Sequence, residues 1–343
     1  MKSVLTAMTM ISLSAPAFAG GIGRTDQPVD VLFQTGTFVE LSFGTLVPTV
    51  SGSFASPGDS GNIAVAAPFQ VAGLAFKKDF GDRLSLGLTV DQPFAAEAEY
   101  TRPGYPLFGT EAHFKTNSLS FLGLYRFNDA FSVIGGVRVL QTDGDVTLTA
   151  PAYSTTYSPD TDLAYVIGAA FEKPEIALRL AVTYSSATNF ALKGSAGTAS
   201  VDLPQSVKVD FQTGIAADTL LIASARWADW SHASITDSTA GPLITYNGNT
   251  VSYTIGLGRK FSDTWSGAVL LGYEPPSGDP VSDLIPTDGS ASITVAGIYT
   301  RNRIKVTGGV MYRKLGDATT DTTGAEFSGN SALGVGMKVA LSF

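Results

Sequence analysis

The end of the chain alternates between apolar residues and small or polar ones. The apolar set occupies every second position and closes on the last residue: Leu333, Val335, Met337, Val339, Leu341 and Phe343. A period of two is the pattern of a β-strand with one apolar face. A soluble β-sandwich can also end on such a strand. A membrane barrel, whose strands turn one face to lipid and the other to a polar lumen, is the favoured interpretation.

The same alternation recurs in segments 207–215, 251–258 and 304–313. Their apolar positions suit lipid, and the alternate positions carry polar or small residues that leave room inside a lumen. A closing aromatic such as Phe343 resembles the signal that the outer-membrane barrel assembly machinery reads, so this machinery is an expected partner during biogenesis. The pattern predicts an all-β, transmembrane antiparallel β-barrel.

Composition narrows the class of protein further. Charged residues make up 15% of the chain, against about 25% in soluble domains. After the amino-terminal run, no apolar stretch reaches the roughly 20 residues that a membrane helix needs. The chain has no cysteine, which excludes a disulfide scaffold and a His/Cys metal cluster. The net charge of −8 argues against a nucleic-acid partner, and nothing in the sequence implies a cofactor.

The amino terminus predicts secretion. Lys2 precedes an apolar run over 4–13, and Ala17-Phe18-Ala19 fits a signal-peptidase site, so residues 1–19 are predicted to be a signal peptide. Residues 20–36 precede the first strand. Their apolar cluster at 29–33 favours a plug (hatch) inside the lumen over a disordered periplasmic tail. The barrel is predicted to occupy 37–343, in the bacterial outer membrane.

Connections alternate between short and long along the chain, as in outer-membrane barrels. Several short turns follow a phenylalanine, which predicts an aromatic girdle at one membrane interface: Phe80-Gly81-Asp82, Phe127-Asn128-Asp129, Phe171-Glu172-Lys173-Pro174 and Phe261-Ser262-Asp263. The long polar loops are predicted at 51–67, 92–112, 144–158, 194–203, 233–247, 275–287 and 316–330. About 14 strands lie between these connections, an even number that puts both chain ends in the periplasm.

Catalysis finds little support in the sequence. The chain has two histidines, His113 and His232, both predicted near the outer rim. Asp229 lies near His232, but a Ser-His-Asp hydrolase of the α/β class would need a G-x-S-x-G elbow, which the sequence lacks. The chain is therefore predicted not to be an enzyme.

Four sets of motifs resemble one known family. They are Leu203-Pro204-Gln205-Ser206 with Trp227-Ala228-Asp229-Trp230-Ser231, Thr183-Tyr184-Ser185-Ser186 with Leu192-Lys193-Gly194, Gln92-Pro93-Phe94 with Tyr100, and Leu271-Gly272-Tyr273-Glu274 with Pro286-Thr287-Asp288-Gly289. In this order they resemble the FadL/TodX (OMPP1) family of outer-membrane transporters for long-chain fatty acids and hydrocarbons, over about 37–343. The family's amino-terminal "NPA" is absent, with Gln27-Pro28-Val29 near its place, and Ser290 stands where an arginine is expected.

The resemblance implies a ligand path through the barrel. Apolar residues of the plug and of the third strand's exit, and of an outside loop that could collect ligand or simply pack, are candidate ligand-binding residues: Val31, Phe33, Phe94, Tyr105, Leu107 and Phe108. Strand parity turns Arg138, Lys208 and Lys338 inward, where they could hold a carboxylate head group or pair with Asp210 and other acids. Pro28 and Pro93 are candidate gating residues. Pro93 is predicted to end the third strand early, either as an ordinary strand end or as a lateral opening in the wall.

The predicted function is passive uptake of hydrophobic small molecules such as long-chain fatty acids. Ligand would bind in a greasy lumen and leave through plug movement or a lateral wall opening, with outer-membrane lipid and lipopolysaccharide as surroundings. The alternative is a general aqueous porin or a structural barrel. A porin should conduct ions steadily, whereas a plugged channel should conduct little and bind hydrophobic ligands.

Overall fold

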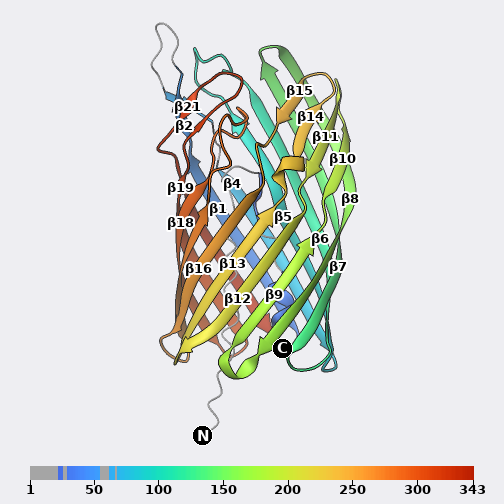
Figure 1. The fold of residues 1–343 in the computed structure, drawn as a ribbon, viewed down its shortest axis with the longest axis vertical. Helices are drawn as coiled ribbons and strands as arrows, with labels where there is room; N and C mark the ends of the chain where they lie inside the picture. The colour runs from blue at the N-terminus through green and yellow to red at the C-terminus, as the bar shows by residue number, and fades with distance from the viewer. Residues whose placement is uncertain (1–21, 26–28, 55–61, 66–67) are drawn as a thin grey trace.

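The computed structural model describes residues 22–25, 29–54, 62–65 and 68–343 of the chain. The predicted signal peptide and Pro28 lie outside this part. The described residues form one closed barrel in which every neighbouring pair of strands is antiparallel (Figure 1). Its 14 strands are β1 (Phe38–Thr49), β4 (Phe69–Phe80), β5 (Leu84–Glu99), β6 (Glu111–Arg126), β7 (Phe131–Thr149), β8 (Ala152–Lys173), β9 (Leu178–Ser185), β12 (Ser206–Ala216), β13 (Thr219–Ala228), β16 (Thr250–Lys260), β17 (Trp265–Glu274), β18 (Ser290–Arg301), β19 (Ile304–Leu315) and β22 (Ser331–Ser342). The predicted fold and strand number are confirmed.

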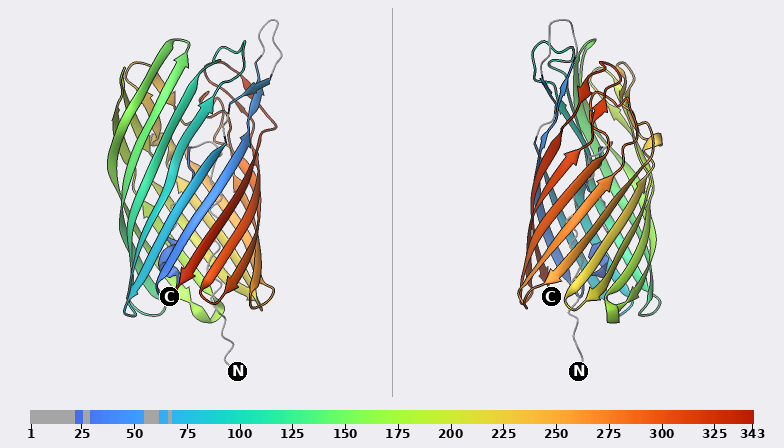
Figure 2. Two further views of the ribbon diagram at one scale, coloured as in Figure 1. Left: turned by 180° about the vertical axis from the view of Figure 1, so that it is seen from behind. Right: turned by 60° about the vertical axis from the view of Figure 1, so that its left-hand side comes forward.

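The ring closes between its first and last strands. β1 pairs with β22 from Phe38 opposite Ser342 to Thr49 opposite Ser331, and Figure 2 shows these blue and red strands side by side. Closure leaves the ring without an unpaired end strand, which is the condition for a sheet to cross a bilayer. Within the described residues, no helix is long and apolar enough to span a membrane.

Side chains alternate along the wall as the sequence predicts. On β22, Leu333, Val335 and Met337 are exposed on the outside, whereas Gly334 and Ala340 are buried on the inside. Large exposed apolar residues cover the outer face of neighbouring strands as well. On a soluble protein such a surface would be a liability, so lipid is its natural surroundings.

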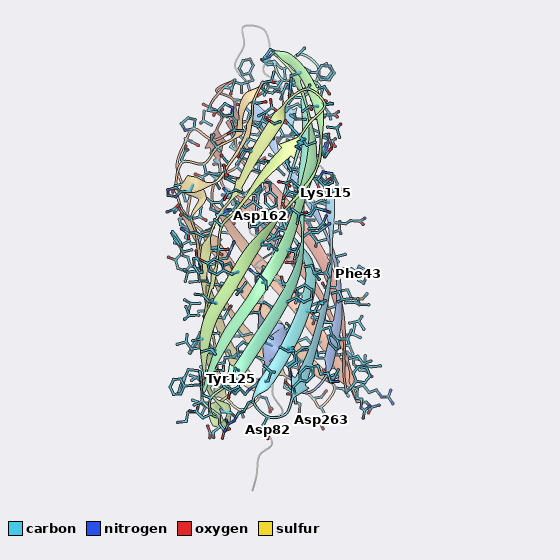
Figure 3. All side chains as sticks on the ribbon, turned by 90° about the vertical axis from the view of Figure 1, so that its right-hand side faces the viewer. Phe43, Asp82, Lys115, Tyr125, Asp162 and Asp263 are labelled. Carbon is cyan, nitrogen blue, oxygen red and sulfur yellow. The ribbon has the colours of Figure 1, made fainter. Side chains whose placement is uncertain are left out.

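Aromatic side chains mark one end of this apolar band. Phe80, Phe127 and Phe261 are exposed beside the short turns, and Phe171 packs on Phe131 with ring centroids 5.0 Å apart. Figure 3 shows Tyr125 at the same rim as Asp82 and Asp263, with Lys115 and Asp162 further along the barrel. Exposed tyrosines recur on the outer face toward the opposite rim: Tyr165, Tyr253, Tyr273 and Tyr312. This arrangement agrees with the predicted girdle.

The tight turns use backbone conformations that their residues predict. Gly81, Asp218 and Asn302 have φ of 68°, 56° and 54°, the left-handed region that glycine, asparagine and aspartate enter most readily. A short 3-10 helix, η2 (Pro174–Ile176), makes the turn between β8 and β9.

The long connections contain more strand than predicted. β7 and β8 extend through the predicted loop 144–158 as one hairpin, and β5 and β6 shorten the predicted loop 92–112. The sequence between the turn at 171–174 and the loop predicted at 194–203, expected to form one strand, divides into β9 and the separate β10 (Thr188–Lys193). Beyond the lipid band, outward positions such as Thr147 and Ser154 are polar. The two-residue apolar alternation therefore stops while backbone pairing continues, and this made the loop predictions wrong.

Two small sheets complete the rim opposite the chain end at Phe343 (Figures 1 and 2). One contains β10 (Thr188–Lys193), β11 (Thr198–Leu203), β14 (Ser234–Asp237) and β15 (Gly241–Ile244). The other contains β2 (Ser51–Ser53), β3 (Asn62–Ala64), β20 (Ala318–Thr319) and β21 (Glu326–Phe327). A short helix, η3 (Trp230–His232), follows β13.

Candidate functional site

The lumen holds part of the predicted plug. The 3-10 helix η1 (Asp30–Phe33) lies inside the barrel near the chain-end rim (Figure 2). Leu32 is fully buried, and it shares an apolar cluster with inward side chains of β6, β7 and β8: Leu122, Leu124, Ile134 and Val166. Phe33 lies beneath the Arg179 guanidinium, 4.3 Å from its ring centroid. η1 is therefore packed against the inner wall of the barrel by side chains that come from several strands.

A buried lysine holds the segment that follows η1. The Lys77 ammonium donates to the carbonyls of Gln34, at 2.6 Å, and Gly36, at 3.1 Å, and forms an ion pair with Asp79. Asp79 in turn accepts a hydrogen bond from the Gly36 amide at 3.0 Å. This latch ties the segment to β4 before the chain enters β1.

The wall splits where β4 and β5 part. Their pairing runs from Phe80 opposite Leu84 to Leu74 opposite Val90 and then stops, while β5 continues along β6 with a register shift between Asp91 and Phe94. Pro93 therefore does not end the third strand, and that prediction was wrong. A proline costs no ladder hydrogen bond here, because the edge of β5 has already lost β4 as its partner.

The chain's own amino-terminal segment occupies this split. The Arg24 amide donates to the Pro93 carbonyl at 2.7 Å, and the Ala95 amide donates to the Ile22 carbonyl at 2.9 Å. On the other side, the Arg24 guanidinium lies over the Phe69 ring of β4, 3.4 Å from its centroid. Residues 22–25 thus bridge β5 and β4 where the two strands no longer pair.

A cavity of about 180 Å³ lies between η1 and the wall formed by β1, β4, β19 and β22. Gly336 is the register partner of both Gly44 and Gly309, so three glycines lie level on adjacent strands of its wall. Apolar side chains line most of the rest: Val31, Phe38, Leu46, Phe69, Val71 and Met311. A second cavity of about 90 Å³ shares Arg24, Leu46 and Phe69 with the first.

Each of the inward cations predicted from strand parity forms an ion pair or a hydrogen bond with another residue of the protein. Lys338 lines the cavity and pairs with Glu40 at 3.2 Å. Lys208 pairs with Asp210 at 3.1 Å. Arg138 is buried, donates to the Ser185 hydroxyl at 2.7 Å and interacts electrostatically with Asp91. Lys208 and Arg138 lie outside the cavity lining.

The predicted apolar residues fall in four different environments. Val31 lines the cavity, and Phe33 lies below it against Arg179. Phe94 and Tyr105 are buried in a larger apolar cluster toward the loop end, where Phe94 meets Trp230 at 6.1 Å between ring centroids.

The candidate residues of the outside loop differ in their exposure to solvent. Tyr105 stacks near Tyr100 at 5.1 Å between ring centroids, and Leu107 packs partly buried on the same cluster. Phe108 is exposed. The structure therefore does not bring the candidate residues into one site. The sequence interpretation missed Arg24, Glu40 and Phe69, because inward parity alone does not say which strands face each other.

The two histidines do not form a hydrolytic triad. His232 uses one nitrogen, Nδ1, toward both Asp229, at 2.9 Å, and Ser231, at 3.2 Å, so the ring cannot relay a proton between them. His113 lies on the outer face between Asp145 and Glu99, at 3.1 and 3.3 Å. Among the described residues, no group of His, Cys, Asp and Glu is arranged to hold a metal ion.

At the loop rim, Asp237 fixes the β14–β15 hairpin. Its buried carboxylate accepts hydrogen bonds from the Tyr157 and Tyr153 hydroxyls, at 2.7 and 3.0 Å, and from the Thr239 and Ala240 amides, both at 2.7 Å. Burial alone would raise the pKa of Asp237, but these hydrogen bonds hold the pKa below its ordinary value of 3.8.

The pKa of Asp237 predicts how the hairpin responds to pH. A carboxylate with a lowered pKa stabilises the fold above its unfolded value, so this stabilisation should be present above pH 3.8 and lost as pH falls below it. Hydrogen exchange of residues 238–244, normalised to intrinsic rates, should report this loss. Asp237→Asn should lower protection by about 1–3 kcal/mol at neutral pH and remove the pH dependence. An unchanged acid profile in the variant would contradict this account.

The chain was compared with known families, sequences and structures, and similar folds were found among solved structures. No family model and no curated protein matches the chain. A FadL homologue from Pseudomonas aeruginosa superposes with a TM-score of 0.74 at 14% identity, over 96% of this chain and 97% of that one. The Pseudomonas putida toluene transporter TodX gives 0.70 at 12% identity, over 95% and 96%. The Ralstonia pickettii toluene transporter TbuX gives 0.63 at 12% identity, over 91% of each chain.

The chain has the FadL/TodX fold. This confirms at the level of fold the resemblance that the motifs indicated, and it identifies a β-barrel of the outer-membrane type. Two of these structures, TodX and TbuX, are toluene transporters by title.

Proposed function

We propose that this chain is an outer-membrane channel for passive uptake of hydrophobic small molecules. The observation that carries the proposal is the split between β4 and β5, bridged by residues 22–25 beside a mostly apolar cavity. A ligand that prefers lipid to water can be held in such a cavity and released sideways through the split. Transport would follow the concentration gradient without a cofactor.

In this proposal residues 20–36 act as the plug, and Arg24 and Pro93 lie at its gate. Arg24 touches both sides of the split, through the Pro93 carbonyl on β5 and the Phe69 ring on β4. Moving residues 22–25 would unpair the β5 edge and join the two cavities that Arg24, Leu46 and Phe69 separate. The predicted partners, outer-membrane lipid, lipopolysaccharide and the assembly machinery, are part of the same proposal.

The solved structures that share this fold support a hydrophobic ligand. Their titles name a FadL homologue, toluene transporters and a monoaromatic hydrocarbon channel. The apolar cluster that fills the loop half of the lumen, including Phe94, Phe114 and Trp230, argues against a wide water-filled pore. A general aqueous porin is therefore the weaker hypothesis.

Purified protein in planar bilayers and nanodiscs tests the proposal. We expect low, unsteady ion conductance together with saturable binding of a hydrophobic probe such as toluene or 1-octanol. A deletion strain should grow more slowly on one or more hydrophobic carbon sources and normally on sugars. Large steady conductance without binding of either probe would favour the porin and overturn the proposal.

A further inference from the structure

Among the charged residues around the cavity of about 180 Å³, acids outnumber bases. Two cations and three anions line it: Arg24, Lys338, Asp30, Glu40 and Asp91. An entering carboxylate would therefore meet a lining with more negative than positive side chains. Its charge would be costly to desolvate unless a cation came within hydrogen-bonding distance.

Both lining cations are already held by the protein. Lys338 on β22 pairs with Glu40 on the adjacent strand β1, with 3.2 Å between Nζ and Oε1. The side chains of both residues are largely buried. Lys305 on β19 also interacts electrostatically with Glu40. Glu40 thus attracts two lysines, of which Lys338 lines the cavity.

Arg24 is held in another way. Its Nε donates to the Ala95 carbonyl at 3.0 Å, its guanidinium lies over Phe69, and Glu97 attracts it electrostatically. Using Arg24 to bind a carboxylate would break the contact that bridges β4 and β5. Lys338 is therefore the cation that an anionic ligand could take with the least rearrangement, and Glu40 is its competitor.

We infer that the cavity selects uncharged hydrophobic ligands over carboxylates, and that Glu40 sets this selectivity by occupying Lys338. The inference rests on the proposed function and narrows its substrate class. The favoured ligand is a compact hydrocarbon, or an alcohol whose hydroxyl needs no counter-ion. A fatty acid carboxylate would have to displace Glu40 and leave that buried acid without its partner.

A matched pair of ligands tests the inference. Equilibrium dialysis of the protein in nanodiscs, at a pH where octanoate is ionised, compares 1-octanol with octanoate, which share a chain length. We expect wild type to bind 1-octanol about tenfold or more tightly than octanoate. Glu40→Gln keeps the shape of the side chain and removes the negative charge that faces Lys338. It should raise octanoate affinity by about tenfold relative to 1-octanol affinity.

A second variant isolates the lysine. Glu40→Gln with Lys338→Met should lose the gained preference, so that the ratio of octanoate affinity to 1-octanol affinity returns to the wild-type value or below. Retention of heat-modifiable migration on gels shows that each variant is folded. Octanol binding without discrimination against octanoate, or no gain in Glu40→Gln, overturns the inference and leaves the channel proposal standing. Absence of binding of both ligands to every folded variant overturns both.

Discussion

Replacing Gly336 with leucine is expected to weaken hydrophobic-ligand binding by about tenfold or more, equivalent to about 1.4 kcal/mol or more. A Cβ at this position meets only the Phe43 carbonyl oxygen, at 3.6 Å, which is an ordinary contact. The rest of the side chain points into the lumen, level with Gly44 and Gly309, and occupies the space that a ligand would need. Dialysis with toluene or 1-octanol measures the change.

The barrel offers a control for this substitution on the opposite face of the same wall. Gly308 lies next to Gly309 but turns to the lipid side, and nothing lies within 4 Å of a Cβ built on it. Gly308→Leu adds the same side chain to the adjacent strand β19 without entering the cavity. Binding should stay at the wild-type level. Equal loss in both variants would indicate a wall defect, and equal retention would show that the ligand lies elsewhere.

The strands and their two faces could be predicted from the sequence because lipid and lumen impose opposite demands on alternate residues. This local signal placed Lys338 inside the barrel and Leu333 outside it. It does not report register, which joins residues far apart in the chain. Gly44, Gly309 and Gly336 become neighbours only when β1, β22 and β19 pair, and Glu40 meets Lys338 for the same reason.

Other features leave little trace in a periodic pattern. Residues 22–25 act as a short strand segment against β5, yet they are a glycine- and arginine-containing stretch without alternation. Pro93 was a useful marker of the place, because proline favours an edge without a partner. The prediction that Pro93 ends the strand was wrong. β5 continues past Pro93, and the wall opens because the pairing between β4 and β5 stops.

Deleting residues 20–36 is expected to raise ion conductance several-fold and to make it steady. The deletion removes η1 and the bridge formed by residues 22–25, while β1 keeps its pairing with β22 and β4 from Phe38 onward. The ladder that closes the ring is therefore intact. Single-channel recording in planar bilayers measures the change, and heat-modifiable migration on gels reports whether the barrel is folded.

Two point substitutions test separately how the two ends of residues 20–36 contribute to the change in conductance. Arg24→Ala removes the guanidinium from the Phe69 ring and from the Ala95 carbonyl, so brief openings should become more frequent. Lys77→Met removes the latch on Gln34 and Gly36 and should loosen η1 from the opposite end. If the folded deletion variant conducts like wild type, residues 20–36 do not close the lumen, and the apolar cluster around Phe94 and Trp230 must do so instead. If only Lys77→Met increases conductance, the path opens at the chain-end rim and the split between β4 and β5 is not the gate.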